Sequence, residues 1–418
     1  MTPGDADRGG NGPPRCPFSL MAEDYPAADP YPTYRSFRDD IPVFFTDDMD
    51  GYWVVTRYDD VFEAGRDWQR FSSAQGVLPR VPAASGTASG RVDLAQERER
   101  AKYKGIPLAT DPPDHALYRR VISKHLGKPA VAQMRGSIRR RIHDLLDGAP
   151  CADEGPAHTF DIAEVLTGPL PGLVLAEVAG LPEKDHDQFQ RWSSEGQFEE
   201  LHRYIESFMD SDCDQGIFGT LRTGRVGDRP LTRAEQVSYG RLLLVAGHET
   251  TSAGLAFMIY HLCTMPGLQD RLRQDPSLRP GAIEEFLRYE PPVQGLWRTV
   301  AEPTELQGCS MAPGDQLLLL WGSANRDERH FRDPDRFDER RDPNDHIVFG
   351  SGRHRCIGAE LARTEMREVL DVLLERFGHI RLADGGRMTT RMSPAGGVRG
   401  LGHLDVTVHD TQRHRVQR

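Results

Sequence analysis

The chain has little lysine, no paired cysteines and no long apolar run, and each shortage excludes a class of protein. Only five of its 52 basic residues are lysine, and 63 acidic residues give a formal net charge of −11. We therefore expect no nucleic acid partner and no binding to an anionic membrane surface. Six cysteines without a repeated short spacing argue against a disulfide framework or a four-cysteine zinc site.

We expect neither a targeting segment nor a membrane-spanning segment. Residues 1–20 are polar and rich in glycine and proline, without the apolar centre of a signal peptide, and we expect them to be flexible. The uncharged segment from Thr250 to Leu262 is too short to span a membrane and contains polar side chains. We interpret it as a buried central helix and expect a cytoplasmic, monomeric protein.

Periodicity predicts a mainly α protein with a smaller β region, an α+β fold. Most segments beyond Asp111 have the spacing of helices, and apolar runs at residues 41–45, 52–56, 304–308, 316–321 and 404–408 are typical of strands. We expect one domain over residues 21–410 and a tail over 411–418. The segment Gln75 to Thr110, rich in Gly, Ser, Ala and Pro, is too long for a routine connection, and such loops often form lids.

The most specific segment is FGSGRHRCIG, which sets Cys356 in a glycine-rich turn directly before an apolar-periodic helix. A helix N-terminus favours the thiolate form of a cysteine, and glycines let the backbone approach a flat ligand closely. A lone cysteine near glycine is nevertheless more often a buried structural residue. Neither a CxxCH haem-attachment motif nor a second pair of zinc ligands accompanies it.

A second segment, VAGHETTSAG, places an acid and an alcohol, Glu249 and Thr250, in the most apolar helix of the chain. Burying them without partners is costly. Thr250 is spaced to bond the carbonyl of Ala246 and, with Gly247, to loosen the helix enough for a groove of dioxygen size. Taken alone, the segment also fits a kinked helix with a surface acid.

Two further segments carry paired charges. EEFLRYEPP puts Glu285 and Arg288 on one helical face, where an isolated pair is usually a weak surface salt bridge. DPPDHALYRR puts His115 and Arg119 on one face of another helix, which starts after two prolines. A solvated basic face is the competing interpretation for the second pair.

Together these segments resemble, in order, the motifs of the cytochrome P450 family. FGSGRHRCIG matches every fixed position of F-G-x-G-x-H-x-C-x-G, VAGHETTSAG is similar to A/G-G-x-D/E-T-T, and Glu285 with Arg288 matches E-x-x-R. The resemblance runs from about Pro17 to Val408. It implies the cytochrome P450 fold, a triangular helical prism with a long central helix over haem b.

The resemblance also implies roles for single residues. Cys356 would be the axial ligand of the haem iron, and Glu249 and Thr250 would relay protons while O2 is activated. The implied cofactor-binding residues are His115, Arg119, Ala246, Arg298, Phe349, Gly350, His354, Cys356 and Gly358, of which His115, Arg119, Arg298 and His354 would bind the propionates.

Structural and substrate-binding residues are implied in the same way. Glu285 and Arg288 would be buried and would bond an arginine of the loop before the cysteine turn, for which Arg336 is the best candidate. The substrate pocket is expected at the loop after Gln75 and at Val245, Ala246, Gln294, Leu296, Gly397 and Val398, with Phe189, Trp192 and Phe198 as lid residues.

The expected activity is insertion of one oxygen atom of O2 into a C–H or C=C bond of a small organic molecule, such as a secondary metabolite. Because one domain uses nearly the whole chain, electrons from NAD(P)H would come through a separate ferredoxin and ferredoxin reductase. A docking face for the acidic ferredoxin is expected at Arg120, Lys124, Lys128, Arg353, Arg355, Arg363 and Arg367. An atypical oxidation (coupling, nitration or a peroxide-driven step) and ligand binding without catalysis stay open.

Overall fold

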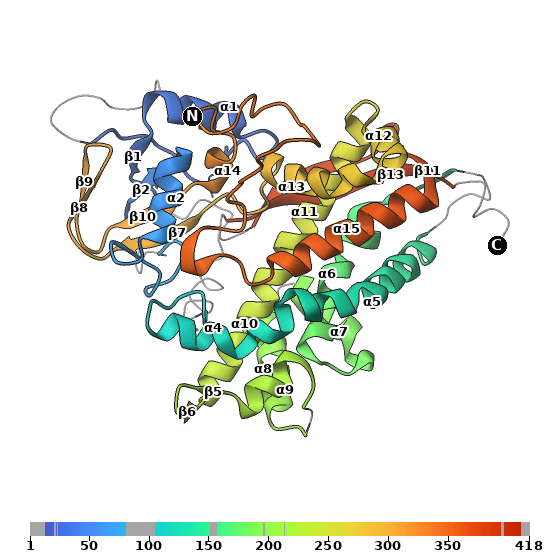
Figure 1. Cartoon of the computed structure of the whole chain (residues 1–418), viewed down its shortest axis with the longest axis horizontal. Coiled ribbons are helices and arrows are strands. Elements are labelled where there is room, and N and C mark those ends of the chain that lie inside the picture. Colours follow the sequence, from blue (N-terminus) through green and yellow to red (C-terminus); the bar gives the residue numbers. More distant parts are fainter. Residues whose placement is uncertain are drawn as a thin grey trace.

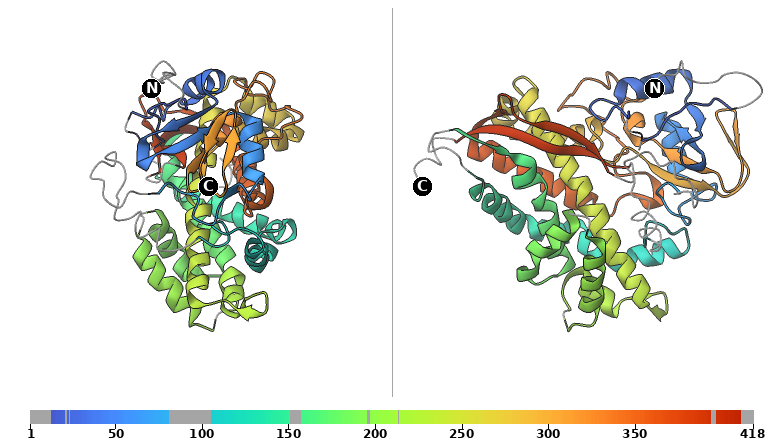
Figure 2. Two further views of the ribbon diagram at one scale, coloured as in Figure 1. Left: turned by 90° about the vertical axis from the view of Figure 1, so that its left-hand side faces the viewer. Right: turned by 180° about the vertical axis from the view of Figure 1, so that it is seen from behind.

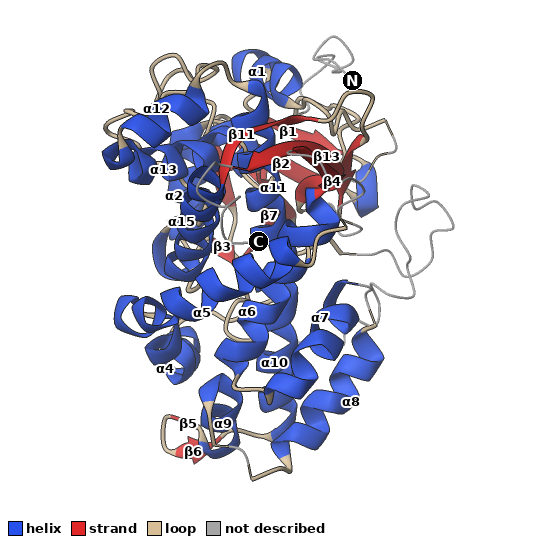
Figure 3. Cartoon of the chain, turned by 90° about the vertical axis from the view of Figure 1, so that its right-hand side faces the viewer, coloured by secondary structure: helices blue, strands red, loops and turns tan. Residues whose placement is uncertain are grey.

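The computed structural model describes residues 13–410 except 21, 23, 81–104, 151–156, 195–196, 213 and 394–396. Figure 3 shows most of the strands in the upper part of the view, a small hairpin at the bottom and helices making up the rest, which confirms a mainly α protein with a smaller β region.

A five-stranded sheet forms the N-terminal side of the molecule, in the order β1-β2-β10-β7-β3. Strand β10 pairs with β2 in parallel, and the other neighbours are antiparallel. The sheet packs against α1 and α2 and buries aromatic side chains on both faces. Its elements are α1 (Tyr31–Asp40), β1 (Val43–Thr46), a 3-10 turn (Asp48–Asp50), β2 (Tyr52–Val55), α2 (Tyr58–Arg66), β3 (Phe71–Ser72), β7 (Leu296–Val300), β10 (Gln316–Leu319) and α14 (Trp321–Ala324).

The predicted flexible segment ends earlier than residue 20. The backbone of Cys16 donates to Phe45 at 3.0 Å, and Phe45 donates to Pro14 at 2.8 Å, which fixes this segment against β1. Phe18 and Leu20 are buried in the adjoining core. The difference arises because apolar side chains stand at alternate positions, Cys16, Phe18 and Leu20. Burying them stabilises the segment by more than the conformational entropy that its Gly and Pro residues lose.

A second sheet has the order β11-β13-β12, and β4 pairs with residues 405–409 of β13, the part of that strand that also pairs with β11. The long strand β13 lies beside α11 (Figure 2, right). The strands are β4 (Ala157–Asp161), β11 (Phe377–Leu382), β12 (Met388–Met392) and β13 (Arg399–Asp410), and two small hairpins consist of β5 (Arg225–Val226) with β6 (Arg229–Pro230) and β8 (Thr304–Leu306) with β9 (Cys309–Met311).

The helices share one large apolar core. Their ends follow local signals: a capping box of Thr232 with Glu235 begins α10, and Gly180 in the left-handed region ends α6. The helices are α4 (Asp114–Leu126), α5 (Lys128–Asp147), a π-helical turn (Ala163–Thr167), α6 (Pro169–Ala179), α7 (His186–Ser194), α8 (Phe198–Met209), α9 (Gly216–Thr223), α10 (Arg233–Gly247), α11 (Glu249–Thr264), α12 (Leu268–Gln274), α13 (Arg279–Tyr289) and α15 (Ala359–Arg376), with 3-10 turns at Glu183–Asp185, Pro276–Leu278 and Gly352–His354.

Helices α10 and α11 run in succession diagonally through the molecule (Figure 1). The stretch Arg233–Thr264 is long and apolar enough to cross a membrane by composition, but 61% of its most apolar window is buried inside the protein. The predicted loosening is confirmed, since α10 ends at Gly247, α11 begins at Glu249, and His248 between them has φ −84° and ψ −67°. A Cβ at Gly247 would lie 2.8 Å from Leu175 of α6, so the helices approach closely here.

Candidate active site

Cys356 lies between a 3-10 turn and the start of α15. Its backbone N–H donates to the carbonyl of Phe349 at 2.7 Å, and the N–H of Gly358 points at the thiol. The side chain is accessible, yet desolvation by the surrounding protein raises its pKa, against the lowering effect of Gly358 and nearby arginines. An accessible sulfur in a largely desolvated setting indicates a recessed position facing an open space.

The turn reaches this shape through two glycines with positive φ, Gly350 at 73° and Gly352 at 65°. A side chain at Gly352 would also come within 3.0 Å of the backbone of Arg66 in α2. The sequence FGSGRHRCIG therefore closes a tight turn against α2 and presents the thiol at the N-terminal end of α15.

Four side chains that are able to carry positive charge gather beside this turn. The rings of His115 and His354 lie 4.3 Å apart, and the charges of Arg298 and Arg119 act on His354. Burial and these neighbours lower the pKa of His354 to about 3, and burial lowers that of Arg298 to about 10. The structure thus brings together all four residues predicted to bind the propionates.

These groups have few partners. Arg298 is 3% exposed and donates to the carbonyl of Trp297, and neither ring nitrogen of His354 has a hydrogen-bond partner. Within the described ranges, no carboxylate lies within ion-pair distance of any of the four. A buried guanidinium without an anion and buried ring nitrogens without hydrogen-bond partners are both unfavourable, so the cluster fits a ligand that brings carboxylates. Haem b, with two propionates and an iron for the thiol of Cys356, would meet these requirements.

The predicted acid and alcohol lie at the start of α11. The hydroxyl of Thr250 donates to the carbonyl of Ala246 at 2.7 Å, which confirms the predicted bond. The carboxylate of Glu249 accepts from Arg391 of β12 at 3.4 Å. Arg391 had no signal in the sequence, because its strand lies about 140 residues away from the motif.

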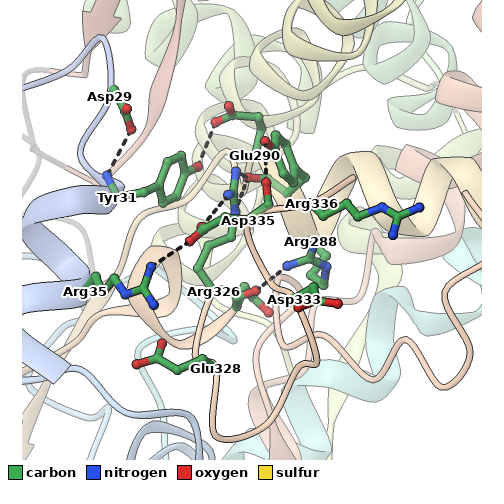
Figure 4. A network of polar contacts seen from close by, with 12 residues as sticks. Asp29, Tyr31, Arg35, Arg288, Glu290, Arg326, Glu328, Asp333, Asp335 and Arg336 are labelled. Atoms are coloured by element: carbon green, nitrogen blue, oxygen red, sulfur yellow. Dashed lines mark hydrogen bonds and ion pairs between the residues drawn. The ribbon is translucent and has the colours of Figure 1, made fainter. Parts of the chain in front are cut away.

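Glu285 and Arg288 are fully buried and form two hydrogen bonds of 2.8 and 2.7 Å. The third member of the brace is Arg341, whose Nε lies 3.1 Å from both oxygens of Glu285. The prediction of Arg336 is wrong: its side chain is exposed and extends away from Arg288 (Figure 4). The carbonyl of Arg336 instead accepts from Arg341, because the loop turns back there.

One side of the central helix is open. Val245, which is 40% exposed, and the exposed Ala246 lie in the last turn of α10, whereas most of the following helix, α11, is buried. Leu296 and Val398 are partly exposed. The prediction of Gln294 is wrong, because that side chain is fully buried and its amide bonds Tyr34 and Pro291 in the N-terminal core.

The strand alternation explains this error. Val293, one residue before Gln294, is partly exposed and bridges Val398. The side chains of successive residues in an extended segment point to opposite sides. A prediction that is off by one residue therefore names a side chain in the core instead of one on the open side. Val293 was missed although it is the apolar member of the pair.

Comparison with known proteins agrees with this geometry. The family model for cytochrome P450 matches residues 217–277 and 278–396. The chain is 33% identical to the cytochrome P450 monooxygenase PikC of Streptomyces venezuelae over 94% of each chain. It is 32% identical to a mycinamicin IV hydroxylase/epoxidase of Micromonospora griseorubida, over 79% of this chain and 83% of the relative. The chain belongs to the cytochrome P450 family.

A solved structure agrees as well. The chain superposes on cytochrome P450 CYP109Q5 of Chondromyces apiculatus with a TM-score of 0.79 at 29% identity, covering 94% of this chain and 98% of the other. The protein therefore has the predicted cytochrome P450 fold and is a P450 monooxygenase, a haem-dependent oxidoreductase.

The predicted docking face of this P450 is only partly available. Five of its cations are exposed, namely Arg120, Lys124, Lys128, Arg353 and Arg355. Arg363 is not free for a partner, because two hydrogen bonds of 2.7 Å bind it to Glu284 of α13. Arg367 is half-buried, and its Nε has no hydrogen-bond partner.

The predicted lid residues do not form a group on the surface of the P450. Phe189 is 1% exposed and belongs to the helical core, and Trp192 is partly buried with its ring 5.3 Å from that of Tyr204. The side chain of Phe198 and most of the Gln75 to Thr110 segment lie outside the described residues.

Proposed function

We propose that this P450 inserts one oxygen atom of O2 into a C–H or C=C bond of a small, mostly apolar secondary metabolite. Electrons would come from NAD(P)H through a separate ferredoxin and its reductase, in the cytoplasm. The observation that carries the proposal is the cluster of two arginines and two histidines beside the thiol of Cys356, in which Arg298 is buried without an ion pair and neither ring nitrogen of His354 has a hydrogen-bond partner.

In this proposal Cys356 ligates the iron of haem b, and His115, Arg119, Arg298 and His354 bind its propionates. Bound in this way, haem b activates dioxygen, because an electron-donating thiolate ligand favours cleavage of the O–O bond. Gly358 contributes a backbone N–H to the thiolate, which stabilises its charge.

Glu249 and Thr250 supply protons. The Thr250 hydroxyl is fixed by the carbonyl of Ala246 and lies at the open side, whereas the Glu249 carboxylate is held by Arg391. The Glu249 carboxylate would take up a proton from solvent and transfer it to Thr250 Oγ, whose own hydroxyl proton moves on into the open space, and the carboxylate is then ready for the next proton. Bulk water would otherwise deliver protons without control.

The substrate class follows from the open side. Val245, Ala246, Val293, Leu296 and Val398 are all apolar and all at least partly exposed, and Val293 bridges Val398. Apolar walls with few polar groups favour an apolar or polycyclic molecule. The name of the Micromonospora relative, a hydroxylase/epoxidase, supports oxygen insertion at C–H and C=C bonds.

The exposed cations on α4, at the start of α5 and in the cysteine turn support docking of an acidic ferredoxin. The net charge of −11 would otherwise repel such a partner, so a local positive surface is needed.

The test combines a spectrum with product analysis. The reduced protein with CO should show the red-shifted Soret band of a thiolate-bound haem, and Cys356→Ser should abolish it. Compounds that shift the Soret band of the oxidised protein are then incubated with ferredoxin, reductase and NADPH. Oxygenated product supports the proposal. A normal band in Cys356→Ser would refute the ligand assignment, and unchanged product per electron in Thr250→Ala would refute the proton relay.

A further inference from the structure

We infer that Glu284 and Arg363 form a charge pair that positions the thiolate loop and tunes the electron richness of Cys356, with His346 as a third member. The inference rests on the proposed function, in which Cys356 ligates haem. It assigns Glu284 and Arg363 as positioning residues, because they act through Phe349 and the loop.

The pair links three parts of the chain. Arg363 of α15 donates from Nε and Nη2 to the two oxygens of Glu284 of α13, each at 2.7 Å. The ring of His346, with its side chain 3% exposed, bonds the same carboxylate at 3.0 Å. Parallel hydrogen bonds of this kind hold a guanidinium in one orientation.

The fixed guanidinium lies over an aromatic ring next to the thiol. Arg363 Cζ is 4.4 Å from the ring centre of Phe349, and the carbonyl of Phe349 accepts the backbone N–H of Cys356. The positive charge of Arg363 also acts directly on Cys356. Burial raises the pKa of Glu284, but its bonds to His346 and Arg363 outweigh this and lower it to about 2, so its negative charge persists.

The adjacent residue on α13 holds a different part of the same loop. Glu285 bonds Arg341 and the amide of Asn344, whereas Glu284 bonds His346 and Arg363. Two consecutive acids therefore fix the loop at two successive places before Cys356. Of the two acids, only Glu284 bonds a cation, Arg363, whose charge acts on Cys356.

The chain offers a matched control. Arg279 of α13 and Asp371 of α15 form an ion pair of 2.8 Å with side chains 14% and 18% exposed. It joins the same two helices, but Asp371 lies about two turns beyond Arg363 along α15. Asp371→Asn therefore weakens the same helix contact without changing the charges beside Phe349.

The experiment measures the ratio of reduced to oxidised haem at one applied potential in the wild type, Glu284→Gln, Arg363→Gln, the double variant and Asp371→Asn. Reduction adds negative charge to the site, so an unpaired Arg363 favours it and an unpaired Glu284 opposes it. We expect the ratio to rise about threefold or more in Glu284→Gln, to fall by a similar factor in Arg363→Gln, and to return near the wild-type value in the double variant.

A merely structural pair predicts another pattern. Single variants that shift the ratio in the same direction, or no more than Asp371→Asn does, would overturn the inference. If either single variant fails to retain haem, the neutral double variant must recover the red-shifted CO band, and its failure to do so also overturns the inference. A wild type without that band would refute the proposed function instead, so the two failures are distinguishable.

Discussion

Exchanging Arg341 for methionine removes one cation from the buried brace around Glu285. Glu285 is 0% exposed and the side chain of Arg341 is 9% exposed, so both charges are shielded from water. Arg341 also donates to the carbonyls of Arg332, Asp333 and Arg336, which fixes the turn of the loop. Methionine keeps a long apolar side chain and loses all of these bonds.

The expected loss can be estimated from the remaining contacts. Removing one partner of a buried ion pair typically costs about 3 to 5 kcal/mol. Glu285 keeps both bonds to Arg288 and the bond to Asn344, so its charge is not left uncompensated. We therefore expect the lower end, a decrease of about 3 kcal/mol in the free energy of unfolding.

Arg336→Met is the matched variant, because it removes the same charge from the same loop. Arg336 is exposed, so its loss should change the free energy of unfolding by no more than about 0.5 kcal/mol. Urea unfolding followed by circular dichroism compares the two variants without the ionic screening of guanidinium. Equal losses, or a larger loss in Arg336→Met, would refute the assignment of Arg341.

Three further predictions concern other parts of the molecule. Burial raises the pKa of Glu365 from 4.5 to about 8, so the folded state favours the protonated carboxyl group. The contribution of this group to the free energy of unfolding is fully present below pH 4.5 and is lost as the pH rises to 8. Glu365→Gln should remove this loss of about 3 to 5 kcal/mol, and parallel pH curves of urea unfolding for the two proteins would contradict the prediction. Ala246→Phe fills the open side of α10, so substrates should no longer shift the Soret band while the CO band persists, and an unchanged substrate titration would place the pocket elsewhere. Arg391→Ala removes the ion pair to Glu249 and should lower product per electron about two- to tenfold, whereas Arg387→Ala on the same hairpin, which pairs with Asp405, should not; equal effects would exclude a role in proton delivery.

Features carried by neighbouring residues could be predicted from the sequence. The cysteine turn, the break at Gly247 and the bond from Thr250 to Ala246 all depend on residues within a few positions of one another. Their geometry follows from glycine conformations and from the helical repeat. The Glu285 and Arg288 pair was predictable for the same reason, since i,i+3 residues of a helix share a face.

Features that join distant segments could not be predicted in the same way. The loop from Phe331 to Phe349 is largely irregular, so no periodicity indicates which of its arginines faces Glu285. The choice between Arg336 and Arg341 depends on where the loop turns. The ion pair of Glu249 with Arg391 depends on the packing of β12 and β13 beside α11, which sequence spacing does not encode.

The charges around Cys356 are balanced differently on its two sides, and this difference follows from their functions. Toward α13 and α15, Arg363 forms an ion pair with Glu284, so the positive charge on that side is neutralised by a carboxylate. Toward α4 and β7, His115, Arg298 and His354 form no ion pair among the described residues, although the charge of Asp111 acts on His115 and Arg298, and burial lowers the pKa values of all three groups. The buried guanidinium of Arg298 and the unpartnered ring nitrogens of His354 destabilise the chain, and a ligand that brings carboxylates would convert that cost into affinity. In the proposed function, haem b would therefore bind on the side without ion pairs, and Glu284 and Arg363 would adjust it from the other side.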